Sequence, residues 1–116
     1  MQVLRCSLAD EGDPTLITLV FSNRTAADII LREELETLAQ MHPQRFTLHL
    51  MLSRPDESHS WPEENTGRVS VDCLRRQLPT AAEDVCVLYC GTPAFNATVK
   101  EGLTALHYHS GQSFCF

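Results

Sequence analysis

Two apolar, β-branched segments constrain the fold of this 116-residue chain more strongly than any other feature. TLITLVFS, residues 15–22, and EDVCVLYCG, residues 83–91, are almost continuous in apolar side chains. Such runs are typical of strands that are covered on both faces in a parallel sheet. RFTLHLMLS, residues 45–53, alternates its leucines with other side chains and predicts a further strand, and SFCF, residues 113–116, predicts a short closing one.

Segments with helical spacing alternate with these strands. The pattern predicts a long polar loop over residues 53–68 and four helices, within residues 1–9, 25–42, 69–79 and 92–106. Alternating helices and strands predict an α/β fold with a doubly wound, mainly parallel sheet, in which ligands bind at the carboxyl ends of the strands. Such a unit normally opens with a strand, whereas this chain opens with a helical pattern, so we expect a sheet that lacks its first strand.

Charge and cysteine content limit the partners and the compartment. The 15 acidic residues outnumber the 9 basic ones, which are scattered, and this disfavours nucleic acid and anionic membranes as partners. No apolar run reaches the roughly 18 residues of a membrane span, and the N-terminus has no secretory leader pattern. The five cysteines lack C-x-x-C spacing, so we expect buried free thiols and a reducing, intracellular compartment.

The segment YCGTPAF, residues 89–95, predicts a sharp turn from a strand into a helix. Gly91 permits the turn, Thr92 is a suitable helix cap, and Pro93 suits the first helical position. A helix start of this kind binds anions such as phosphate through its free N–H groups. The alternative is a well-formed turn with no ligand, and the local sequence alone favours that alternative.

Asp28 has two interpretations that the sequence weighs equally. It follows the strand predicted at residues 15–22, where an acidic residue in dinucleotide-binding folds accepts hydrogen bonds from the adenosine ribose. Alternatively, Thr25 and Asp28 form a capping box, in which the carboxylate only satisfies the start of a helix.

Four further side chains also leave alternatives open. Cys90 is either a thiol beside a reactive ring or, as its place in an apolar run favours, part of the core. Trp61 either stacks on a ligand or covers an edge of the sheet. His107 and His109 form an H-x-H pattern, but no cysteine or carboxylate cluster completes a metal site, so surface histidines are favoured.

Three segments resemble NADH-cytochrome b5 reductases, which belong to the wider ferredoxin reductase superfamily. Residues 1–39, MQVLRCSLADEGDPTLITLVFSNRTAADIILREELETLA, are similar to the part of these enzymes that follows their glycine-rich turn. VLYCGTPAF, residues 87–95, resembles their cysteine-glycine motif, and the terminal SFCF resembles their aromatic C-terminus. The resemblance is strongest at FSNRTAADIILREELE, residues 21–36, and extends to the reductase module of nitrate reductases.

The resemblance implies that residues 1–116 form part of an NAD-binding domain, which passes a hydride from NADH to FAD on a separate lobe. By this similarity Asp28 faces the adenosine ribose and favours NADH over NADPH. Asn23 and Arg24 lie along the same edge.

At the nicotinamide end, the resemblance implies that Cys90 is the catalytic residue. Gly91, Thr92 and Pro93 are implied to lie beside the nicotinamide, and Phe116 is implied to end next to the flavin ring. The family usually has further prolines after its cysteine-glycine pair, whereas this chain has Thr92 and Ala94. This departure affects the details of the nicotinamide pocket.

Two classes of function follow. The first is the C-terminal, NADH-binding part of an oxidoreductase that passes electrons through FAD to a haem protein such as cytochrome b5, at the cytosolic face of a membrane or in the cytoplasm. The flavin lobe and the glycine-rich turn are absent from these residues, so we expect the chain alone to hold no FAD and to be inactive.

The second class is an interaction or regulatory module that retains only the α/β sheet. An incomplete sheet is expected to self-associate or to accept a strand from another chain.

Overall fold

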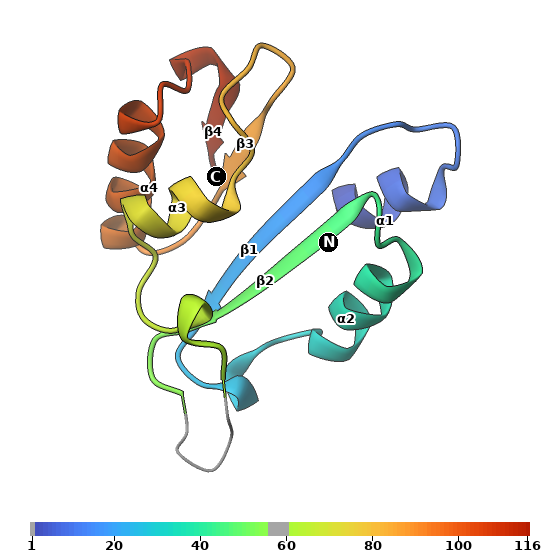
Figure 1. Cartoon of the computed structure of the whole chain (residues 1–116), viewed down its shortest axis with the longest axis horizontal. Coiled ribbons are helices and arrows are strands. Elements are labelled where there is room, and N and C mark those ends of the chain that lie inside the picture. The colour runs from blue at the N-terminus through green and yellow to red at the C-terminus, as the bar shows by residue number, and fades with distance from the viewer. Residues whose placement is uncertain (1, 56–60) are drawn as a thin grey trace. The chain divides into compact units, whose positions relative to one another are not determined.

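Two units make up the chain, Met1–Thr66 and Gly67–Phe116 (Figure 1). The computed structural model describes residues 2–55 and 61–116, so residues 56–60 of the predicted loop lie outside the described residues. Among the described helices, none has the length and apolar character needed to cross a lipid bilayer.

The first unit contains a two-stranded parallel sheet and two α-helices (Figure 1). The strands pair in register from Ile17 opposite Phe46 to Asn23 opposite Leu52. The elements of this unit are α1 (Gln2–Ala9), β1 (Ile17–Asn23), the 3-10 turn η1 (Ala26–Asp28), α2 (Arg32–Met41), β2 (Phe46–Leu52) and the 3-10 turn η2 (Glu63–Asn65).

Two apolar clusters hold this unit together. One joins both helices to the sheet and consists of Leu4, Leu8, Leu35 and Phe46, all less than 7% exposed. The other joins the segment after η1 to the end of β2 and consists of Ile29, Leu50 and Leu52. Most of these core residues lie at apolar positions of the predicted helices and strands, and Ile29 is the exception.

The single helix predicted over residues 25–42 is interrupted. The one-turn η1 is followed by extended backbone at Ile29 and a left-handed residue, Leu31 (φ 59°), before α2 begins. The physical reason is burial: Ile29 is 8% exposed in the cluster with Leu50 and Leu52, whereas Ile30 and Leu31 are exposed. Burying Ile29 requires the chain to leave the helical path.

The second unit repeats the alternation with shorter strands. Its core consists of Val99, Leu103 and Tyr108, and Phe95 and Leu106 pack against these residues. The elements are α3 (Val71–Gln77), β3 (Val87–Tyr89), α4 (Pro93–Ala105), the 3-10 turn η3 (Ser110–Gln112) and β4 (Ser113–Cys115), with β3 and β4 parallel.

The predicted α/β class and parallel pairing are confirmed, but the described strands form two separate two-stranded sheets. A doubly wound sheet has the strand order 3-2-1-4-5-6, and removal of strand 1 leaves the pairs 3-2 and 4-5. The observed pairs, β2 with β1 and β3 with β4, are those two pairs. The expectation of a sheet without its first strand accounts for this pattern.

Hydrogen bonding distinguishes the two sides of β1. Alternate residues of a parallel strand direct both backbone groups to the same neighbour, and Ile17 and Asn23 both bond to the β2 side. Thr18, Val20 and Ser22 therefore direct their N–H and C=O groups away from β2. Within the described residues these groups have no partner. We call this side of β1 the bare edge.

Candidate functional site

The carboxyl end of β1 holds two of the predicted cofactor-binding residues. The Asn23 carbonyl accepts a hydrogen bond from the Ser53 N–H at 3.0 Å, and the Arg24 carbonyl accepts one from the Arg54 N–H at 2.8 Å. These bonds fix the backbone beyond the last strand pair. The Arg24 side chain is exposed, whereas the Asn23 Nδ2 is buried and has no partner in the part of the chain described. Asn23 therefore presents an unsatisfied donor where a doubly wound sheet binds its ligand.

Asp28 forms the capping box that the sequence allowed. Its Oδ2 accepts hydrogen bonds from the Thr25 N–H at 3.1 Å and from the Thr25 Oγ1 at 2.9 Å. The structural interpretation of this carboxylate is thus confirmed. The capping box uses only one of the two carboxylate oxygens. Asp28 is exposed, and its Oδ1 makes no hydrogen bond to any described residue. One oxygen holds the turn, and the other is free to accept from a ligand.

The turn after β3 has the predicted local structure. Thr92 is the N-cap of α4, its Oγ1 accepts from the Phe95 N–H at 3.2 Å, and Pro93 lies in the first turn. The Phe95 N–H is therefore not available to an anion. The N–H groups of Gly91, Thr92 and Ala94 have no partner among the described residues, so the turn retains donors.

Gly91 is required by packing, because a Cβ at this position would lie 2.9 Å from Cγ of Phe95. Asn96 holds the same turn from the helix side, and no sequence motif pointed to it. Its Nδ2 donates to the Gly91 carbonyl at 3.2 Å, while its buried Oδ1 has no partner in the described chain. The only sequence signal was an amide side chain five residues after the glycine.

Cys90 and Phe116 are neighbours in the second unit. The Phe116 N–H donates to the carbonyl of Tyr89 at 3.0 Å, which places the C-terminal residue beside the strand end that carries Cys90. Both side chains are exposed, Phe116 to 78%. The favoured interpretation of Cys90 as a core residue is therefore wrong.

The broader expectation of buried thiols is also wrong for most cysteines. All five are free, but only Cys73 is buried, and the exposed ones are Cys6, Cys86, Cys90 and Cys115. Three of these, Cys86, Cys90 and Cys115, lie beside or within the two-stranded β3–β4 sheet, where a strand has a neighbour on one side only. An apolar run in a sheet this narrow leaves part of its surface uncovered.

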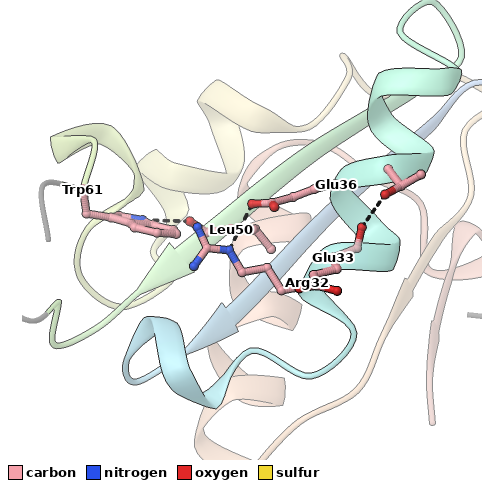
Figure 2. Close-up of polar contacts among 6 residues, drawn as sticks. Arg32, Glu33, Glu36, Leu50 and Trp61 are labelled. Atoms are coloured by element: carbon pink, nitrogen blue, oxygen red, sulfur yellow. Dashed lines mark hydrogen bonds and ion pairs between the residues drawn. The ribbon is translucent and has the colours of Figure 1, made fainter.

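The structure also shows the surroundings of Trp61 and of the two histidines. The Trp61 Nε1 donates to the Leu50 carbonyl at 3.1 Å, so this side chain covers the edge of β2 (Figure 2). His107 and His109 are exposed, as expected of surface histidines. In the described ranges, no group of three or more metal-ligating side chains comes together.

The predicted site residues thus form two groups. Asn23, Arg24 and Asp28 lie at the end of β1 in the first unit. The second unit holds the other five, which surround the ends of β3 and β4: Cys90, Gly91, Thr92, Pro93 and Phe116. Each group lies at the carboxyl end of a parallel strand, where α/β sheets bind ligands.

Comparisons with known proteins identify the family of the chain. The family model described as "Oxidoreductase NAD-binding domain" matches residues 1–101. NADH-cytochrome b5 reductase 1 of Bos taurus is 46% identical over 93 residues, which cover 80% of this chain and 30% of the relative. NADH-cytochrome b5 reductase 2 of Xenopus tropicalis is 37% identical over 117 residues, which cover 100% and 38%.

Solved structures show the same relationship. The cytochrome b5 reductase domain of Ulva prolifera nitrate reductase superposes with a TM-score of 0.87 and 31% identity, covering 99% of this chain and 44% of that one. The CS-b5R domains of human Ncb5or, in their NAD+ form, give a TM-score of 0.83 with 26% identity. The chain therefore spans about 30% to 44% of the relatives quoted first in each comparison. It has a ferredoxin reductase-like α/β fold, and it belongs to the oxidoreductase NAD-binding domain family, with NADH-cytochrome b5 reductases among its relatives.

Proposed function

We propose that this chain is the NADH-binding part of a cytochrome b5 reductase-like oxidoreductase, which passes electrons from NADH through FAD to a haem protein such as cytochrome b5. The observation that carries the proposal is the free Oδ1 of Asp28 at the end of β1, in a chain whose family is a nucleotide-binding one. A carboxylate oxygen suits the two hydroxyl groups of an adenosine ribose.

The residues at the two strand ends fit parts of a dinucleotide. Asp28 supplies the acceptor for ribose, and the buried Nδ2 of Asn23 is a donor that a ligand oxygen would satisfy. At the second strand end, free N–H groups of the Gly91 turn and the exposed Cys90 supply polar contacts for a carboxamide ring. When bound, NADH supplies the hydride; the residues of this chain bind and orient it.

The isolated chain offers few residues that could bind FAD. The exposed ring of Phe116 is the one contact assigned to the flavin, and a lone aromatic ring does not hold a cofactor of that size. The isolated chain is therefore proposed to be colourless and inactive, with FAD carried by a separate lobe or another chain. Four exposed free cysteines support a reducing, intracellular location.

Asp28→Thr tests the proposal. Binding of NADH, NADPH and ADP-ribose to the chain, and of FAD as a comparison, is measured by isothermal titration calorimetry. We expect NADH to bind more tightly than NADPH, because the 2′-phosphate of NADPH would place a second anion beside the carboxylate, at a cost of about 1–3 kcal/mol. The Thr variant should lower the ratio of NADH to NADPH affinity. The control Asp84→Thr, which removes an exposed acid in the other unit, should leave this ratio unchanged.

A melting curve of the Asp28→Thr variant distinguishes the role of Asp28 as a helix cap from its role as a ligand for ribose. Loss of the capping box lowers the free energy of unfolding by roughly 0.5–2 kcal/mol whether or not Asp28 binds ribose. A lower melting temperature with an unchanged ratio of NADH to NADPH affinity would leave Asp28 as a cap only. If the wild-type chain binds neither NADH nor ADP-ribose, the bare edge of β1 favours the alternative function, an interaction module that accepts a strand.

A further inference from the structure

A pocket of about 520 Å³ lies within the first unit, apart from the residues assigned to the nucleotide. Its walls come from α2 and from the segment that contains η2, and its floor includes Leu48 and Leu50 of β2 (Figure 2 shows this region). None of Asn23, Arg24 and Asp28 lines it. The proposed function therefore leaves this pocket without a role.

The floor of the pocket contains an open position of the β2 edge. Residues of β2 that face away from β1 are partly closed off: the Phe46 N–H donates to the carbonyl of His42 at 2.8 Å, and the Leu50 carbonyl accepts from Trp61. Leu48 lies between them and also faces away from β1. Its N–H and C=O make no hydrogen bond to any described residue. A strand-like ligand can pair with both groups.

One carboxylate, that of Glu36, lines the pocket and is held in an ion pair. The Glu36 Oε1 accepts from the Arg32 Nε at 3.0 Å. The Arg32 guanidinium also lies 5.3 Å from the centre of the Trp61 ring, which holds it against the aromatic face (Figure 2). The Oε2 of Glu36 has no partner in the described residues. Further carboxylates lie on the two elements that form the walls, at Glu33, Glu63 and Glu64.

We propose that this pocket binds an extended peptide segment that carries a lysine or arginine side chain, supplied by a partner protein. The peptide backbone pairs with the N–H and C=O of Leu48, and the basic side chain reaches the free oxygen of Glu36. Apolar peptide side chains cover Leu50 and the exposed part of Trp61. Charge complementarity selects this ligand, because α2 and η2, which supply the walls, carry five glutamates against one arginine, and the whole chain has a net charge of -6.

Trp61 reports directly on this binding, because it is the single tryptophan of the chain and lines the pocket. The probe is the blocked peptide acetyl-Val-Lys-Val-Lys-Val-amide, and the comparison is the same peptide with glutamate in place of lysine. We expect a saturable change in Trp61 fluorescence with the lysine peptide only. A lysine peptide that is N-methylated on alternate residues should bind at least about tenfold more weakly, because it cannot pair with Leu48.

Two variants test the contribution of Glu36. Glu36→Gln should weaken binding of the lysine peptide about threefold to tenfold, as expected for a partly exposed charge pair, while Glu101→Gln on α4 should not. Gln40→Lys, at an exposed position that lines the pocket, should weaken the lysine peptide and strengthen the glutamate peptide. Circular dichroism spectra verify that the variants fold.

Three results would overturn the proposal. The first is the absence of a saturable signal with the lysine peptide. The second is equal binding of the lysine and glutamate peptides, which would remove the role of Glu36. The third is equal binding of the N-methylated peptide, which would show attraction to the acidic surface without pairing at Leu48.

Discussion

At the scale of single residues, Asp13 makes a contribution to stability that depends on pH. Its Oδ1 accepts from the N–H and Oγ1 of Thr15, and its Oδ2 accepts from the Ser7 Oγ at 2.9 Å. These bonds tie α1 to the turn that leads into β1. They favour the ionised carboxylate, and the hydrogen bonds from Thr15 lower the pKa of Asp13 from 3.8 to about 2.

The sign of the pH dependence follows from this lowered pKa. An unfolded chain protonates Asp13 near pH 4, whereas the folded chain does so near pH 2, so the stabilisation is present above about pH 4 and is lost as the pH falls toward about 2. We expect Asp13→Asn to melt below the wild type at neutral pH and to approach it in acid. Melting curves from neutral pH to about pH 2 test this. Asp84→Asn is the control, and a deficit of Asp13→Asn that is independent of pH would contradict the prediction.

At the scale of elements, the sequence predicted best what is decided locally. Thr92 caps α4 as expected, and Ser70 caps α3 in the same way, because a cap needs only a side-chain oxygen and an N–H three residues later. The interruption before α2 was not predicted, since it depends on Ile29 entering a cluster with residues more than twenty positions away. Strand β3 is shorter than its apolar run for a similar reason, because strand length is set by the neighbour available to pair.

Leu31→Asn tests the interruption before α2. Leu31 adopts a left-handed backbone at φ 59°, where a leucine is strained and an asparagine is tolerated, and its side chain is 44% exposed. We expect the substitution to raise the free energy of unfolding by roughly 0.5–1 kcal/mol. A continuous helix would give the opposite sign, because asparagine is a poorer helix former than leucine. Gln40→Asn within α2 is the matched control and should be slightly destabilising in chemical denaturation.

At the scale of the whole molecule, sequence patterns predicted which strand ends carry the candidate site residues, but not all of the contacts around them. The positions of Asp28 and Cys90 follow from strand order and turn chemistry, which local patterns report. The contacts of Asn96 and Trp61 do not, because they depend on which carbonyl a long side chain reaches after folding. The spacing of apolar residues predicts which face of a helix or strand is buried. It does not predict which strand edges remain unpaired.

The bare edge of β1 yields the last prediction, self-association of the isolated chain. Thr18, Val20 and Ser22 direct their backbone groups away from β2, and β1 is apolar and seven residues long. An unpaired edge of this kind is a template for another strand. By contrast, the outer edge of β2 is partly covered by Trp61. We therefore expect sedimentation equilibrium to show an average mass that rises with concentration, as two copies pair along β1.

Val20→Pro tests this pairing at the backbone. The N–H that proline removes at position 20 points toward the bare edge, so the substitution should abolish self-association and leave the β1–β2 pairing in place. Leu19→Pro removes an N–H that bonds to β2 and should instead unfold the first unit, as circular dichroism would show. Thr18→Lys, which places a charge on the same strand, provides a second monomeric variant if proline is not tolerated. A wild-type chain that stays monomeric at all concentrations, or a Val20→Pro variant that still associates while folded, would show that the bare edge does not recruit a strand.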